Sequence, residues 1–262
     1  MKKPRITPND VRWMNLLSAT LMLALALLLL LALLQWLTRL PQFAMAGISV
    51  HGDITHNNVL TLRANVLPRL SGNFFSVDLA RARSAFEAMP WVRRASVRRQ
   101  FPNRLSVTLQ EHQAVAFWGA ENESRLVNHF GEVFEANSGE IERDDLPRLS
   151  GPDGQSAQLL GMYHAVKDRF AAIEAAPVTL ELSGAGNWRL QLDSGAAIEL
   201  GRGSVDEVSA RIDRFVRTLT QVASRYGRKP NSLESADLRY EQGYALRLRG
   251  VTTATEIKKK QG

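Results

Sequence analysis

The sequence predicts an α+β protein that a single N-terminal transmembrane helix anchors in a membrane. Three observations support this. A long uncharged apolar run lies near the N-terminus, a stretch with the periodicity β-α-α-β-β follows it, and a mixed, mainly antiparallel β-rich region with helices fills the remainder of the 262 residues. A chain of this length holds one large domain or two small ones.

The apolar run from Leu16 to Leu37 contains no charged residue. A helix needs about 20 apolar residues to cross the hydrocarbon layer of a bilayer. We therefore expect a transmembrane helix over residues 15–37. Trp13 and Trp36 lie at the two ends of the run, where amphipathic rings anchor a helix at the membrane interfaces.

The charges around the run predict its orientation. Only Arg39 follows it closely, whereas four basic residues precede it, namely Lys2, Lys3, Arg5 and Arg12. Basic residues stay on the cytoplasmic side, so we expect a cytoplasmic tail over 1–14 and an exported C-terminal bulk. The alternative is a cleaved signal peptide, because "AMAG" at Ala44–Gly47 resembles a cleavage site, although the apolar run is longer than the ~7–15 residues of a signal sequence.

A short linker over 38–46 leads to the first exported module, which we expect over 47–113. A strand opens it, and apolar residues at helical spacing follow over 57–70. Asp78 is the expected N-cap of a second helix. Two alternating strands then flank the turn "FPN", with arginines on their polar face.

The second domain is expected over 114–250, and a disordered polar tail over 251–262. Short strands with Gly-containing turns predict an antiparallel sheet, which two helices interrupt. Ser204 and Glu207 have the spacing of a capping box at the start of the second helix. We prefer this capping box to a phosphate-binding loop, because two acidic residues in the first turn would repel a phosphate.

Catalytic and metal-binding patterns are not recognisable in the sequence. The chain has no cysteine, and its five histidines are scattered without the spacing that places two ligands on one helical face. A nucleophile elbow and an S-x-x-K motif are both missing. The sequence therefore predicts a protein that is not an enzyme and has no cofactor and no metal.

The stretch "WVRRASVRRQ" carries several arginines, and three interpretations of it are considered. It forms a solvated strand face, a surface for docking another protein, or a site for an anionic lipid or polymer. We do not expect nucleic acid to bind, because the stretch lies beyond the cytoplasmic membrane and no aromatic residues are interleaved to stack bases.

The stretch "ADLRYEQGYALRLRG" near the C-terminus is interpreted as one closing strand. A last strand often forms the edge of a sheet, where an incoming strand can pair with it. Gly243 in its middle would mark a bulge or let another backbone approach closely. The other interpretation is an ordinary closing strand with amphipathic tyrosines.

The order of these features resembles the FtsQ/DivIB family of bacterial cell-division proteins. The matching motifs run in family order and include "PWVRRASVRRQFPNRLSVTLQEHQAVAFW", "LVNHFGEVF", "IELGRGS" and "ADLRYEQGYAL". The resemblance implies that the first exported module is a POTRA domain. It also implies a non-enzymatic scaffold in the inner membrane at the division site, which joins FtsB and FtsL and regulates septal peptidoglycan synthesis.

The resemblance also implies which residues bind partners. The FtsB-binding edge strand would comprise Arg239, Tyr240, Gln242, Gly243, Tyr244, Ala245, Arg247 and Leu248. Gln242, Tyr244 and Leu248 depart from the usual family pattern, so the resemblance implies pairing through the backbone there. A face of the POTRA domain that recruits other division proteins would comprise Arg94, Val97 and Arg99. The alternative function is a POTRA-type protein that handles substrates for protein export or outer-membrane assembly.

Overall fold

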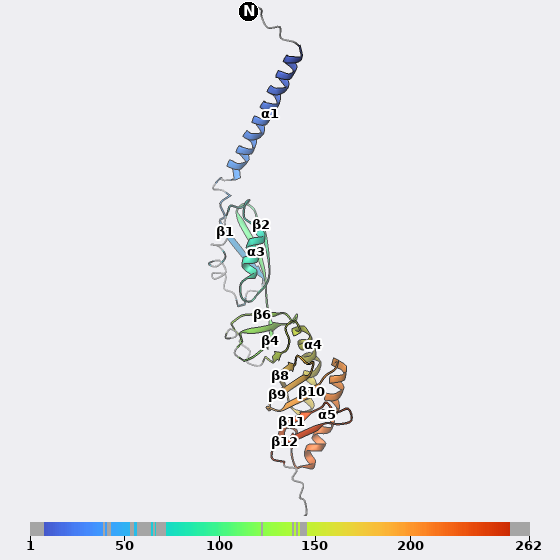
Figure 1. Ribbon diagram of the computed structural model, residues 1–262. Coiled ribbons are helices and arrows are strands. Elements are labelled where there is room, and N and C mark those ends of the chain that lie inside the picture. The colour runs from blue at the N-terminus through green and yellow to red at the C-terminus, as the bar shows by residue number, and fades with distance from the viewer. Residues whose placement is uncertain are drawn as a thin grey trace, which may run out of the picture. The chain divides into compact units, whose positions relative to one another are not determined.

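The computed structural model describes residues 8–38, 40, 43–52, 55–56, 64, 66, 72–121, 123–137, 139, 141 and 146–251. The chain forms two compact units, Met1–Glu111 and His112–Gly262, which are described one at a time (Figure 1). Four expected features fall partly or wholly on other residues: the cytoplasmic tail, the linker, the helix over 57–70 and the C-terminal tail. Of the C-terminal tail, only Val251 belongs to the described residues, and it packs against the core of the second unit.

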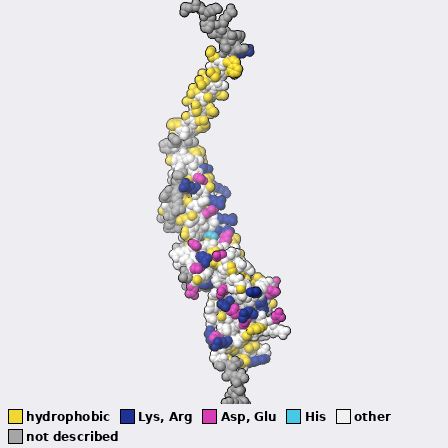
Figure 2. Space-filling view, viewed as in Figure 1, with side chains coloured by type: hydrophobic (Ala, Val, Ile, Leu, Met, Phe, Trp, Pro, Cys, Tyr) yellow, Lys and Arg dark blue, Asp and Glu magenta, His cyan; other side chains and the backbone are white. Residues whose placement is uncertain are grey.

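The first unit begins with the long helix α1, Pro8–Thr38, which starts several residues before the expected span. Its segment Val11–Trp36 is 26 residues long with a mean hydropathy of 2.7, and none of the side chains in its most apolar part is buried within the protein. Figure 2 shows this helix as a continuous apolar surface. By length and composition, α1 is therefore suited to cross a bilayer.

A three-stranded sheet forms the core of the rest of the first unit. Its strands are β1 (Gly47–Gly52), β2 (Val92–Gln100) and β3 (Arg104–Glu111), and β3 lies in the middle of the sheet. β1 runs parallel to β3, and β2 forms an antiparallel hairpin with it. The helix expected over 57–70 lies outside the described residues, except for Ala64 and Val66, which are both helical.

Helix α3, Leu79–Glu87, packs on this sheet. Asp78 caps it as expected, because its carboxylate accepts hydrogen bonds from the backbone N–H groups of Ala80 and Arg81. Phe86 is fully buried from the helix side, against a cluster that includes Leu105 of β3. These elements, together with the sheet, confirm the expected POTRA topology as far as the described residues reach.

The second unit is built on one mixed sheet of nine strands. The strands are β4 (Ala114–Trp118), β5 (Arg125–Asn128), β6 (Val133–Glu135), β7 (Arg148–Ser150), β8 (Pro177–Leu182), β9 (Trp188–Leu192), β10 (Ala197–Gly201), β11 (Leu233–Asp237) and β12 (Ala245–Leu248). Their order is β12-β11-β10-β9-β8-β7-β4-β5-β6, so β12 and β6 form the two edges. Most pairs are antiparallel, but β7 pairs in parallel with β4 and β8, and β10 with β11. The short β7 was not expected from the sequence.

Two helices that touch each other pack on this sheet. The first, α4, covers Ser156–Val166 and continues as the 3-10 helix η4, Lys167–Ile173. The second, α5, covers Val205–Arg225. A one-turn 3-10 helix, Pro230–Ser232, leads from α5 towards β11.

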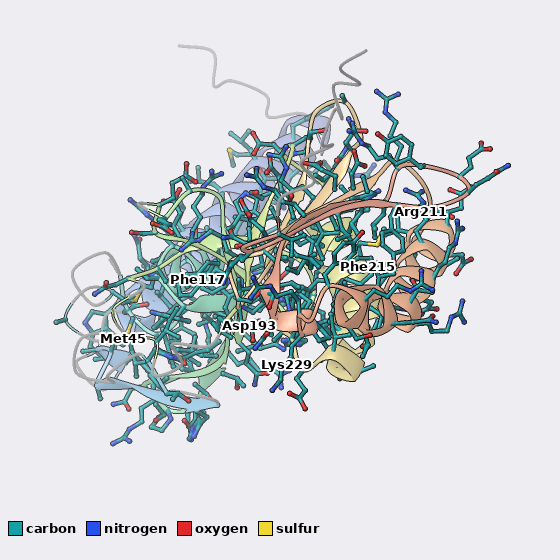
Figure 3. All side chains as sticks on the ribbon, turned by 90° about the horizontal axis from the view of Figure 1, so that it is seen from below. Met45, Phe117, Asp193, Arg211, Phe215 and Lys229 are labelled. Atoms are coloured by element: carbon teal, nitrogen blue, oxygen red, sulfur yellow. The ribbon has the colours of Figure 1, made fainter. Side chains whose placement is uncertain are left out.

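The apolar face of α5 packs against the sheet, with Val208, Ile212, Phe215 and Leu219 all fully buried (Phe215 is labelled in Figure 3). Ser204 caps α5 as expected, because its hydroxyl accepts from the Glu207 N–H and the Glu207 carboxylate accepts from the Ser204 N–H. The capping box is thus confirmed.

The capping box makes a stability prediction. We expect Ser204→Ala to lower the free energy of unfolding by about 1 kcal/mol, because an N-cap hydrogen bond to the first turn of α5 is lost. Urea unfolding of the full chain in a mild detergent, followed by tryptophan fluorescence, measures this, since Trp118 and Trp188 both lie in the core of the second unit. Ser224→Ala in the last turn of α5 is the matched control, with an expected change below about 0.5 kcal/mol. Equal losses in the two variants would contradict the prediction.

Candidate partner-binding surface

The C-terminal stretch predicted as one strand is in fact two strands and a loop. β11 ends at Asp237, residues 238–244 form the loop, and β12 starts at Ala245 and pairs antiparallel with β11. The prediction of a single strand from 236 to 250 was therefore wrong. Gly243 lies in the loop and marks no mid-strand bulge.

Arg239 leaves β11 and turns back onto its end. Its Nε and Nη2 donate to the two carboxylate oxygens of Asp237, at 2.9 and 2.6 Å. The Asp237 carboxylate also accepts from the backbone N–H of Arg239 at 3.1 Å. These bonds, the side-chain bond with Arg239 above all, lower the pKa of Asp237, so its carboxylate stays charged to a lower pH than that of an ordinary aspartate. The guanidinium remains exposed to solvent while its orientation is fixed.

The two tyrosines of the loop have opposite environments. Tyr240 is 58% exposed. Tyr244 is half-buried, and its hydroxyl lies 2.7 Å from the hydroxyl of Thr218 on α5. Its ring meets Phe215 edge-on, with centroids 5.0 Å apart. Tyr244 therefore holds the loop on α5, whereas Tyr240 is available to a partner.

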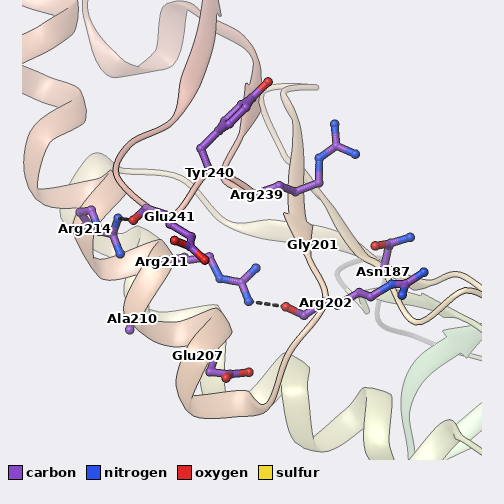
Figure 4. Close-up of a pocket in the computed structure, with 10 residues that line it drawn as sticks. All are labelled: Asn187, Gly201, Arg202, Glu207, Ala210, Arg211, Arg214, Arg239, Tyr240 and Glu241. Carbon is purple, nitrogen blue, oxygen red and sulfur yellow. Dashed lines mark hydrogen bonds between the residues drawn. The ribbon is translucent and has the colours of Figure 1, made fainter.

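Two arginines of α5 hold the backbone around a hollow of about 590 Å³ (Figure 4). Arg211 donates to the carbonyl oxygens of Leu200 and Arg202, and Arg214 donates to the carbonyl oxygen of Glu241 at 2.5 Å. The hollow is lined by Asn187, Gly201, Arg202, Glu207, Ala210, Arg211, Arg214, Arg239, Tyr240 and Glu241. Because Arg211 and Arg214 are engaged in the fold, Arg202 supplies exposed positive charge here, and Arg239 adds an exposed guanidinium that is paired with Asp237.

The remaining predicted residues lie on β12 and in the loop before it. Ala245 and Arg247 are exposed on β12, and Arg247 forms an ion pair with Glu234 of β11 at 3.3 Å. Leu248 is only 4% exposed and belongs to the core, so its side chain cannot meet a partner. Gln242 is exposed and Gly243 is half-buried in the loop.

The predicted face of the first unit has one member with an internal role. Arg94 is exposed and Val97 is half-buried on β2. Arg99 donates three hydrogen bonds to the backbone carbonyl oxygens of Phe74, Phe75 and Val77, at 2.8, 3.1 and 2.9 Å. Arg99 therefore holds a loop of its own domain. The other two members of the predicted face are Arg94, whose side chain is exposed, and Val97, which packs in part against the core.

Trp13 and Trp36 both project from α1 with more than half of their surface exposed. They lie at the two ends of the apolar segment, as an interfacial role requires. Among the described residues, no three His, Cys, Asp or Glu side chains gather closely enough to hold a metal ion.

Comparison with known proteins identifies the family. Residues 43–112 match the POTRA domain of FtsQ type, and residues 116–239 match the C-terminal domain of the cell division protein FtsQ/DivIB. The cell division protein FtsQ of Burkholderia pseudomallei (strain K96243) is 42% identical over 252 residues, which cover 96% of this chain and 98% of that protein. This chain belongs to the FtsQ/DivIB family.

Two further relatives support the membership in FtsQ/DivIB. The cell division protein FtsQ of Thiomonas arsenitoxydans is 38% identical over 95% of this chain and 91% of that protein. The cell division protein FtsQ of Bordetella pertussis is 35% identical over 92% of each chain. This FtsQ/DivIB chain is thus a division protein with a POTRA domain, and its apolar helix α1 fits a single-pass membrane protein.

Sequence reasoning missed the residues that position the candidate surface. Arg211, Arg214 and Thr218 lie three and four residues apart and therefore share one flank of α5. Their spacing was visible in the sequence, but their targets were not. These targets lie in two other segments, the end of β10 and the loop 238–244. Glu111 was also missed: it is 7% exposed and accepts hydrogen bonds from the N–H groups of Thr55 and His56.

The contrast between the tyrosines can be tested. We expect Tyr244→Phe to lower the free energy of unfolding by about 1 kcal/mol, because the hydrogen bond to Thr218 is lost. Tyr240→Phe is the matched control and should leave stability unchanged, since its hydroxyl is exposed. Urea unfolding of each full-length variant gives both values. A larger loss for Tyr240→Phe than for Tyr244→Phe would contradict the assignment.

Proposed function

We propose that the chain is a non-enzymatic scaffold of the bacterial division machinery in the inner membrane. Its N-terminus lies in the cytoplasm and its C-terminal bulk in the periplasm at the division site. It binds FtsB and FtsL, links early and late division proteins and regulates septal peptidoglycan synthesis. Membership in the FtsQ/DivIB family supports the division role, and the basic residues before α1 support the orientation.

The observation that carries the proposal is the exposed edge β12. It pairs with β11 on one side and ends the order of the sheet. On its other side, alternate backbone N–H and C=O groups therefore lack a strand partner within the part of the chain that the structure describes. Unpaired groups of this kind accept an incoming strand, with the backbone giving affinity and the side chains giving specificity. A strand of FtsB would extend the sheet here.

The side chains of the loop that leads into β12 indicate the chemistry of the partner. Tyr240 offers an exposed aromatic ring, and tyrosine and arginine are the residues that most often anchor interfaces. Arg239, held in place by Asp237, presents an exposed guanidinium beside the hollow. A partner strand with a carboxylate at this position would share this preoriented guanidinium with Asp237.

The other parts of the chain receive separate roles. In this proposal, residues 15–37 span the membrane and 1–14 form the cytoplasmic tail, while 38–46 link the span to the POTRA domain. The POTRA domain covers 47–113, the β domain 114–250, and a polar tail follows over 251–262. Other division proteins dock through the POTRA domain, at Arg94 and Val97, and through the transmembrane helix. Neither a cofactor nor nucleic acid has a role.

Hydrogen exchange tests the strand addition directly. The full chain in lipid nanodiscs is titrated with the periplasmic segment of FtsB, and exchange is followed across residues 236–248. We expect slower exchange of β12 amides on binding, because N–H groups that face solvent become paired with the new strand. Binding without new protection in this range would show that the edge is not the contact.

A blocked edge provides the second test. Tyr240→Ala combined with Gly243→Trp should abolish FtsB binding, because an anchor is removed and a bulky ring is placed beside β12. The fold should persist, since a Cβ atom at Gly243 meets nothing within 4 Å.

Arg94→Glu is the control on the POTRA face and should leave FtsB affinity unchanged, because Arg94 and β12 belong to different units. Retained affinity in the blocked-edge variant, or a large loss in Arg94→Glu, would refute the assignment. Arg99 is unsuitable as a control because it holds a loop of its own domain.

A further inference from the structure

Four phenylalanines form one cluster at an end of the POTRA sheet, which we call the aromatic tip: Phe43, Phe74, Phe75 and Phe101. Phe75 meets Phe43 at 4.8 Å and Phe74 at 5.2 Å between ring centroids, and Phe101 meets Phe74 at 6.2 Å. Phe74 is buried, but Phe75 is 46% exposed and Phe101 is 76% exposed. An exposed pair of large apolar rings on a fixed support requires an explanation.

Backbone hydrogen bonds make the aromatic tip a defined structure. The Phe74 N–H donates to the Phe43 carbonyl oxygen at 3.0 Å, and the Ala46 N–H donates to the Asn103 carbonyl oxygen at 2.9 Å. Arg99 adds its three bonds to the carbonyl oxygens of the loop 74–77. Three segments distant in sequence are thereby joined at one end of the sheet, so the two exposed rings are presented from a stable base.

The register of the sheet places this end where the chain arrives from α1. β1 is parallel to β3 and pairs Gly47 with Arg104, so the start of β1 lies beside the β2–β3 turn that carries Phe101. Phe43 is only five residues beyond Thr38, the last residue of α1. At no more than ~3.6 Å per residue, about 18 Å separates these two residues at most. The limit follows from bond geometry alone, whatever the angle between α1 and the sheet.

The length of α1 then brings the tip to the membrane surface. The 26 residues of its apolar segment extend about 39 Å at ~1.5 Å per residue, more than the ~30 Å of a hydrocarbon core. The end of the helix therefore reaches the headgroup layer, where aromatic rings are favoured. Arg98 and Arg104 are exposed on the strands that flank the Phe101 turn, and arginine side chains near a membrane surface are attracted to anionic lipids.

We propose that the aromatic tip is a lipid-contact surface, through which Phe75 and Phe101 enter the headgroup layer of the bilayer that α1 crosses. Arg98 and Arg104 face the lipid phosphates. The POTRA domain is thereby held against the membrane at one end. The proposal requires that α1 spans the bilayer, but it does not depend on FtsB, FtsL or any other protein partner.

Depth-dependent quenching tests the contact. Because the chain has no cysteine, Gln100→Cys beside the tip gives a single site for a fluorescent label. The full chain is reconstituted in phosphatidylglycerol bilayers that contain nitroxide-labelled lipid. Gln110→Cys is the matched control, because its side chain is also exposed. Gln100 pairs with Arg104 at the start of β3, and Gln110 lies six residues further along that strand, about 20 Å from Arg104. We expect several-fold stronger quenching at position 100 than at 110.

Removal of the rings separates insertion from mere proximity. In the Phe75→Ser/Phe101→Ser background, the quenching at position 100 should fall towards that of the control. Phe101→Ser alone should reduce it partly, and its side chain is too exposed for its loss to unfold the domain. Unchanged quenching in these variants, or equal quenching at positions 100 and 110, would overturn the proposal. If quenching at position 100 were as strong in bilayers of phosphatidylcholine alone as in phosphatidylglycerol, the role given to Arg98 and Arg104 would be overturned.

Discussion

The packing of α5 against the nine-stranded sheet is the interaction on which the candidate surface depends. One face of the helix is buried in the core, which fixes the helix on the β10–β12 end of the sheet. Its flank then carries Arg211, Arg214 and Thr218 at spacings of three and four residues. These side chains bind the backbone at the end of β10, the carbonyl oxygen of Glu241 and the hydroxyl of Tyr244. A helix placed for hydrophobic reasons thus also sets the shape of both loops around the hollow.

An open sheet necessarily has edges, and the β12 edge of this sheet is short and follows a loop that is fixed on α5. β12 is four residues long, which limits unwanted pairing. The loop before it is held on α5, so little ordering would be needed for the strand addition proposed above. Preorganisation of this kind preserves binding energy that a mobile edge would lose. The guanidinium of Arg239 is likewise preorganised, because its bonds to Asp237 fix its orientation.

The first unit shows how topology gives a small domain two distinct ends. Because β1 is parallel to the central β3, the chain enters beside the β2–β3 turn and leaves at the far end of β3, after Glu111. The aromatic tip and the Arg99 bonds lie at the entry end. Glu111, with its bonds to the N–H groups of Thr55 and His56, lies at the exit end. The buried layer between α3 and the sheet supports both ends at once.

The sequence by itself determined the features that depend on local chemistry. Runs of apolar residues, helical spacing and capping side chains act within a few neighbouring residues, so the membrane span, the α5 capping box, Asp78 and most strands could be predicted. Only the tertiary structure decided the break between β11 and β12, because apolar alternation continues through 238–248 while Tyr244 is drawn to Thr218 from 26 positions away. It also decided that Arg99 binds the loop 74–77 and that Leu248 faces the core. Contacts between distant segments fix these outcomes, and no local pattern records which segments will meet.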